Sequence, residues 1–138
     1  MKDAKDMSER LNYFIKEQNQ QYKRHYFYLH QIIEIKILLE KNKKEIEYNS
    51  GWIEFHKKGI KEHEKIIQET ANFDYKKDQE EKLEFHTMQI KEHHKRNIDY
   101  HNREIEALKK EIELFEQGIK RCEEQIEFLE KKIKENSI

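Results

Sequence analysis

Residues 105–133 read IEALKKEIELFEQGIKRCEEQIEFLEKKI, and this stretch decides the fold. An isoleucine recurs every seven residues, and another apolar or sulfur-containing side chain follows three places after each of the first four. The two columns are Ile105, Ile112, Ile119, Ile126 and Ile133, and Leu108, Phe115, Cys122 and Leu129. This is the spacing of the a and d positions of a coiled coil, so the stretch predicts one long helix with a narrow apolar face.

A second heptad pattern runs through the first half of the chain and contains several polar residues. Its first column is Leu11, Gln18, His25, Ile32, Leu39, Ile46, Ile53, Ile60 and Ile67. Its second column is Phe14, Gln21, Tyr28, Ile35, Asn42, Asn49, His56, His63 and Thr70. The sustained spacing predicts a second long helix, which packs its column residues against a partner.

The two patterns lose phase between Thr70 and Glu81, which predicts a turn there. Asn72 is a residue type that ends or caps helices, and Asp78 with Glu81 has the form of a capping box. The sequence predicts a single domain over 1–138, built from a first helix over 3–71, a turn over 72–78 and a second helix over 79–136.

Folding the chain back at this turn brings apolar column residues opposite each other, with the numbers of facing residues adding to about 150. The polar residues expected to meet are His63 with His86, His56 with His93 or His94, and Asn49 with His101. The predicted fold class is therefore all-α, a long antiparallel coiled-coil helical hairpin. An alternative with three helices places a break at Asn49–Gly51, but Ile46, Ile53 and Ile60 keep their seven-residue spacing across it.

The composition excludes a large globular core, because 41% of the residues are charged and only 35% are hydrophobic. Proline is absent, three residues are glycine, and the net charge is −1 with both signs interleaved. That balance does not favour binding to nucleic acid or to an anionic membrane. The longest apolar stretch is too short to span a bilayer. The lone Cys122 and the lack of a signal-like N-terminus predict a cytoplasmic protein. The sequence contains no known catalytic motif, so we do not expect an enzyme.

The histidines suggest two different functions. The predicted polar positions of the helix interface are Asn49, His56, His63, His86, His93 and His101. In one interpretation they form polar layers that fix the register, and no cofactor is needed. In the alternative, the chain is a metal-binding helical protein that holds zinc or another transition metal through His56, His63, His86 and His93. If the folded protein holds these histidines neutral, their protonation should loosen this region as the pH falls from about 7 to 5.

The apolar surface near the two termini is wider than a two-helix interface requires. The predicted contact residues are Tyr13, Ile15, Tyr22, Tyr26, Leu29, Ile33, Ile37, Leu114 and Phe128. A second copy packing there would make a four-helix assembly, and another helical protein is the alternative partner. In a third interpretation the tyrosines simply lie along the helix flank. The sequence thus favours a structural or protein-interaction module that acts as a spacer, oligomerisation or docking element.

Overall fold

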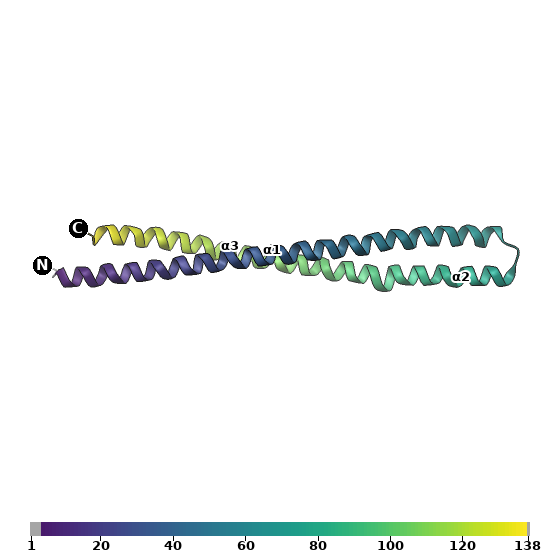
Figure 1. Cartoon of the computed structure of the whole chain (residues 1–138), viewed down its shortest axis with the longest axis horizontal. Helices are drawn as coiled ribbons and strands as arrows, with labels where there is room; N and C mark the ends of the chain where they lie inside the picture. Colours follow the sequence, from purple (N-terminus) through teal and green to yellow (C-terminus); the bar gives the residue numbers. More distant parts are fainter. Residues whose placement is uncertain (1–3, 138) are drawn as a thin grey trace. The chain divides into compact units, whose positions relative to one another are not determined.

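The computed structural model describes residues 4–137, and all the secondary structure in that range is helical (Figure 1). Helix α1 spans Ala4–Glu69, α2 spans Phe73–Met88, the π-helix η1 spans Gln89–His94, and α3 spans Lys95–Glu135. The predicted all-α class is confirmed. Helix α1 continues through Gly51, so the alternative with a break at that point is wrong.

A three-residue link, residues 70–72, separates α1 from α2. Asn72 has an extended backbone, with φ −78° and ψ 115°, and its side-chain oxygen accepts a hydrogen bond of 3.0 Å from the Tyr75 backbone N–H. The hydroxyl of Thr70 in turn accepts from the Asn72 backbone N–H at 3.3 Å. An N-cap of this kind satisfies one of the free donors at the start of a helix, so α2 begins at Phe73.

The predicted turn over 72–78 is therefore wrong in length and position. Asp78, expected to cap the second helix, lies inside α2 and pairs with Lys82 one turn later at 3.2 Å. The first helix ends two residues before the predicted position, at Glu69, and the predicted start at residue 3 lies outside the described residues. The cap at Asn72 explains the difference, because it starts the helix six residues before the predicted residue 79.

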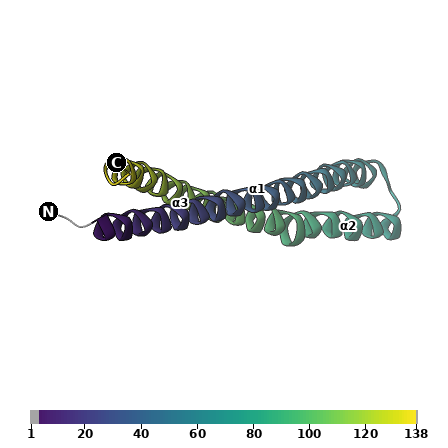
Figure 2. The same ribbon diagram turned by 60° about the vertical axis from the view of Figure 1, so that its left-hand side comes forward.

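The chain divides into two compact units. The middle unit is Leu38–Ala107, and the end unit combines Met1–Ile37 with Leu108–Ile138. Within the middle unit, the last part of α1 lies beside α2 and η1 in both ribbon views (Figures 1 and 2). Each unit has a narrow apolar core. Its buried residues are Ile53, Ile90 and Ile105 in the middle unit, and Ile32, Ile35, Leu108, Cys122 and Leu129 in the end unit.

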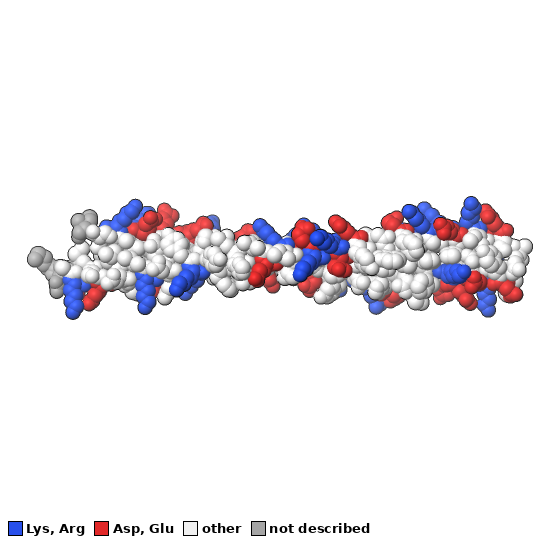
Figure 3. Space-filling model, viewed as in Figure 1, with Lys and Arg blue, Asp and Glu red and all other residues white. Residues whose placement is uncertain are grey.

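The heptad columns match the burial pattern. Every column residue named in α1 is buried or half-buried, and so is every residue of the two columns in 105–133. Positive and negative side chains are interspersed on the face that Figure 3 shows. No helix within residues 4–137 is long and apolar enough to cross a membrane.

Candidate functional site

Four pairs of polar side chains cross the middle unit. The pairs are Asn42 with His101, Asn49 with His94, His56 with His86, and His63 with Gln79. We call them the polar layers. On α1 they occupy one heptad column at seven-residue intervals, and their partners step backward along the chain as the α1 positions step forward. No buried side-chain nitrogen or oxygen in the described range lacks a hydrogen-bond partner.

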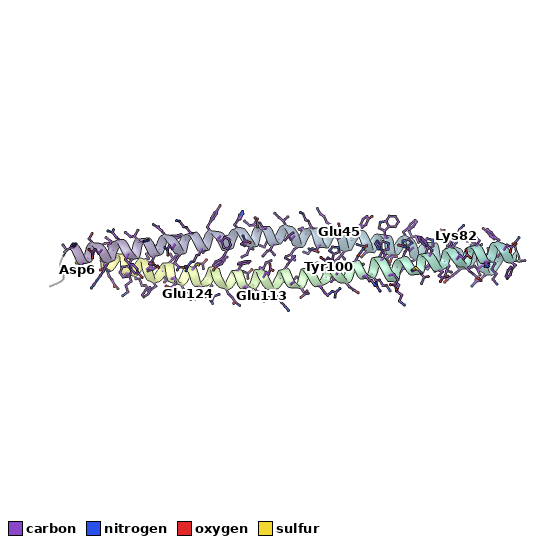
Figure 4. The ribbon with its side chains drawn as sticks, turned by 90° about the horizontal axis from the view of Figure 1, so that it is seen from below. Asp6, Glu45, Lys82, Tyr100, Glu113 and Glu124 are labelled. Carbon is purple, nitrogen blue, oxygen red and sulfur yellow. The ribbon has the colours of Figure 1, made fainter. Side chains whose placement is uncertain are left out.

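The Asn49 layer has a defined donor and acceptor. Asn49 Nδ2 donates to the backbone carbonyl of Glu45, labelled in Figure 4, at 2.8 Å. Because the amide nitrogen is used on α1 itself, Asn49 Oδ1 accepts from His94 Nδ1 at 2.9 Å. Asn42 repeats this arrangement one heptad earlier, with His101 Nδ1 at 2.7 Å from its Oδ1. Both histidines must therefore carry a proton on Nδ1.

The next layer joins two histidines. His56 Nδ1 lies 2.7 Å from His86 Nδ1, so one nitrogen donates and the other accepts. An accepting imidazole nitrogen carries no proton, so the pair keeps this bond only while at least one of the two rings is neutral. In the following layer His63 Nδ1 donates to the Gln79 side-chain oxygen, which can only accept.

Two of these histidines have lowered pKa values. Burial is the main cause at His86, and the neighbouring His56 and His63 lower its pKa further below the ordinary 6.5. Burial is also the main cause at His94, where His93 and His56 add to the lowering of the pKa. Burial in a low-dielectric environment disfavours the charged imidazolium, and a nearby imidazolium repels a second one. The surroundings of His86 and His94 therefore favour the neutral imidazole.

The histidine rings also contact one another between layers. The ring centroids of His63 and His86 are 5.3 Å apart, as are those of His56 and His94. The sequence predicted each of these pairs to face each other in one layer, but they contact only between layers, because His63 pairs with Gln79 and His56 with His86. The Trp52 ring stacks on His94 at 6.1 Å with an angle of 2° between the ring planes. Aromatic and imidazole rings thus form a continuous patch beside the layers.

Two predicted members of the polar layers are placed differently. His93 is exposed and contacts the ring of His94, which is 6% exposed and occupies the layer in its place. The predicted contact of Asn49 with His101 is wrong, because Asn49 pairs with His94. Asn97 also bonds to this layer and donates to Asn49 Oδ1 at 3.4 Å.

The register differs from the predicted one by a single heptad. The numbers of the paired residues add to 142 in the two layers nearest the link and to 143 in the other two. A heptad repeat looks the same after a shift of seven, so both registers bury the same columns. The short link at residues 70–72 selects the observed register, because it places the point of reversal earlier in the chain.

The sum of the paired residue numbers changes from 142 to 143 across η1. In this π-helix the Lys95 backbone N–H bonds to the Ile90 carbonyl, five residues back, so the turn holds one extra residue. The buried positions show the same insertion, because Ile90 and Ile98 are eight residues apart, as are His86 and His94. Sequence analysis missed the π-helix and the layer residues Gln79 and Asn42, and the eight-residue spacing was the available signal for η1.

A metal site has no geometric support in the described range. Residues 4–137 contain no group of three or more His, Cys, Asp or Glu side chains that could hold a metal ion. The Nδ1 atoms of His56, His63 and His86 are already bonded to each other or to Gln79. The fourth candidate, His93, is exposed. The interpretation based on zinc or another transition metal therefore receives no support.

The predicted contact residues near the termini all lie on the surface of the end unit. Their exposed fractions run from 40% for Ile15 to 73% for Tyr26. On α1, Ile15, Tyr22 and Leu29 are seven residues apart, and Tyr26 and Ile33 repeat the same interval four places later. Alternating steps of four and three make a second apolar stripe on α1, beside the buried columns. Leu114 and Phe128 are the exposed members on α3.

The end unit itself is held by a few close contacts. The Tyr28 and Phe115 rings lie 5.8 Å apart, and His25 Nε2 lies 3.2 Å from a carboxylate oxygen of Glu123. Gly118 makes room for the Tyr28 ring, since a Cβ there would come within 2.9 Å of it. These contacts use the buried columns and leave the second stripe of α1 unpaired.

No protein-family model, curated protein or solved structure matches this chain.

Proposed function

We propose that this protein is a non-catalytic structural and protein-interaction module. Its two long helical arms form an antiparallel coiled-coil hairpin that acts as a spacer, oligomerisation or docking element. The reversed order of partners in the polar layers supports the antiparallel pairing. The free, buried thiol of Cys122 suits the reducing cytoplasm, where we place the protein.

The exposed heptad stripe of the end unit carries the proposal. Large apolar side chains at Tyr22, Tyr26, Leu29 and Ile33 are between 43% and 73% exposed, although the buried columns of the same helix are already paired. Burying apolar surface stabilises an assembly by about 25 cal/mol per Å². Heptad spacing is the pattern that another helix recognises, so the partner is a helix.

The simplest partner is a second copy of the chain. Two end units that pack their stripes together make a four-helix assembly with four long segments around one apolar core. A two-fold arrangement lets the same surface serve on both copies, as is usual in homodimers. Leu114 and Phe128 of α3, the other predicted contact residues, are also exposed.

Light scattering coupled to size exclusion tests this proposal. The wild-type protein should show twice the chain mass of 17.2 kDa. Tyr26→Glu with Ile33→Glu should give a monomer of unchanged helicity, because two carboxylates would be buried in the apolar contact. Gln20→Glu with Gln117→Glu adds the same charge at exposed polar positions and should remain a dimer. A monomeric wild-type protein, or equal masses for both double variants, contradicts self-association through this stripe.

A further inference from the structure

His94 is buried, with 6% of its surface exposed, and only one of its two ring nitrogens has a hydrogen-bond partner. Because Nδ1 donates to Asn49 Oδ1, Nε2 of the neutral ring carries no proton and can only accept. Burial, the main cause of the lowered pKa of His94, keeps the ring neutral. Every fully buried side-chain nitrogen in residues 4–137 has a partner, so this unpartnered Nε2 reaches the molecular surface.

The surface beside His94 is a hollow of about 430 Å³ between α1 and the α2–η1 segment, which we call the His94 hollow. Its walls are the aromatic rings of Tyr48, Trp52, Phe55 and Phe85, and its other lining residues are four histidines, including His94, and one glutamine. Among the described residues, no lysine, arginine, aspartate or glutamate lines it. A charged occupant would lose water there without gaining an opposite charge. The hollow therefore suits a neutral, flat and largely apolar group.

Exposed apolar side chains continue beyond the hollow on both helices. On α1, Tyr48, Trp52 and Phe55 follow one another at intervals of four and three residues and are between 40% and 61% exposed. On α2, Met88 lies three residues after Phe85, on the same face, and both are more than half exposed. A free small molecule would cover only the hollow, whereas a polypeptide that places one side chain in it also covers these two rows.

We propose that the His94 hollow binds a tyrosine side chain of a partner protein, with the phenol O–H donating to His94 Nε2. His94 is among the most buried of the lining residues, so its nitrogen lies at the base of the hollow. Tyrosine carries its donor at the far end of the ring, so the ring can lie against the aromatic walls while the hydroxyl reaches the base. The indole N–H of tryptophan lies on the side of a larger ring, and phenylalanine has no donor.

This contact adds to the proposed docking role, but it lies in the middle unit and does not depend on self-association through the end unit. The full-length ¹⁵N-labelled protein is titrated with N-acetyl-tyrosine amide and with N-acetyl-phenylalanine amide, which differ only in the hydroxyl. The indole N–H of Trp52, the sole tryptophan, reports binding. Tyrosine amide should bind about fivefold more tightly, as expected for one additional hydrogen bond, and should shift the ¹⁵N resonance of His94 Nε2. Equal affinities, no saturable shift, or a protonated Nε2 on neutral His94 in the free protein overturns the proposal.

Two further ligands separate the other possible occupants. p-Cresol is the same phenol without peptide groups, and N-acetyl-tryptophan amide carries its donor on an indole. Both should bind more weakly than tyrosine amide, because the first has no peptide groups to contact the exposed rows and the second cannot direct its donor to the base. Equal or tighter binding of p-cresol would assign the hollow to a free small molecule, and equal or tighter binding of tryptophan amide to a different side chain; either result overturns the proposal.

Three variants locate the binding. His94→Phe keeps a flat ring against Trp52 but removes the acceptor, so tyrosine amide and phenylalanine amide should bind alike. Phe85→Ala removes one wall and should weaken tyrosine binding severalfold, whereas Phe27→Ala, its matched control, removes a similarly exposed ring of the end unit and should leave binding unchanged. Circular dichroism verifies that each variant is helical, and the Nε2 shift in the wild type decides the matter if His94→Phe does not fold. A persisting preference for tyrosine in His94→Phe, or unchanged binding in Phe85→Ala, contradicts the assigned site.

Discussion

His56 Nδ1 lies 2.7 Å from His86 Nδ1, so this one polar layer, which pairs two histidines, can hold only one proton between the bonded atoms. This relationship links the packing of the middle unit to pH. Protonating both rings would place two N–H groups, and two charges, against each other. The neighbouring layers donate from Nδ1 to an amide oxygen and do not require a neutral acceptor ring.

Stability should fall as the pH drops below 6.5. The pKa values of His86 and His94 are lowered in the folded protein, mainly by burial, so the unfolded chain binds more protons in this range. The free energy of unfolding therefore decreases between about pH 7 and 5. Urea unfolding followed by circular dichroism at several pH values measures the slope.

Two variants test this prediction: the double variant His86→Gln with His94→Gln, and the single variant His30→Gln as its control. The first should flatten the pH dependence, because the groups with lowered pKa values are gone. The second replaces an exposed histidine beside Glu34 and should leave the wild-type slope in place. Equal slopes in the wild type and the double variant would refute the assignment to the polar layers.

Asn49 and His94 should be energetically coupled. Asn49→Leu removes the acceptor for His94 Nδ1–H and should cost about 1–3 kcal/mol, the usual penalty for leaving a buried polar group unpaired. Asn49→Leu with His94→Leu should cost less than the two single changes together. A double-mutant cycle from urea unfolding should give a coupling of about 1 kcal/mol or more; additive effects would contradict a bonded layer.

Deletion of Lys91 should be tolerated. It removes the extra residue of η1, restores seven-residue spacing from Ile90 onward, and allows a continuous α-helical hydrogen-bond pattern. The midpoint of thermal unfolding should stay the same or rise. Deletion of Glu111 in α3 is the control, because it rotates the following buried column by about 100° and should strongly destabilise the protein. Similar losses from both deletions would show that η1 does not absorb an inserted residue.

Replacing each glycine with alanine should change the free energy of unfolding according to the surroundings of that glycine. Gly51→Ala should raise the free energy of unfolding by about 0.5–1 kcal/mol, since the site is open and alanine favours helix. Gly59→Ala and Gly118→Ala should gain less or lose stability, because the new methyl group meets the rings of His86 and Tyr28. Urea unfolding ranks the three variants, and equal gains would exclude close packing at Gly59 and Gly118.

Sequence reasoning predicted the buried surfaces well and the pairing less well. The column residues, from Leu11 to Leu129, are buried or half-buried because heptad spacing alone determines one face of a helix. Exposure of Tyr26 and Ile33 followed from the same spacing. The register required the length of the link, and the capping choice at Asn72 over Asp78 depends on local hydrogen bonds that composition does not reveal.

The candidate sites, too, could be predicted from the sequence only in part. His63 and His86 were predicted to face each other in one layer, but they contact only between layers, because the register lies one heptad away from the predicted one. His94 was missed as the partner of Asn49 because a strict seven-residue count cannot include the residue inserted at η1. Tyr48 and Phe55 lie off the columns, so heptad analysis treats them as ordinary surface residues.

The pairing of the polar layers is the central claim, because the short link, the π-helix and the proposed hairpin all depend on it. Nuclear Overhauser effects between side chains measure it directly in the wild-type protein. The Asn42 side-chain amide should show cross-peaks to the His101 ring, and the Asn49 amide to the His94 ring. Cross-peaks from the Asn49 amide to the His101 ring, the pairing expected one heptad away, would contradict the register described above.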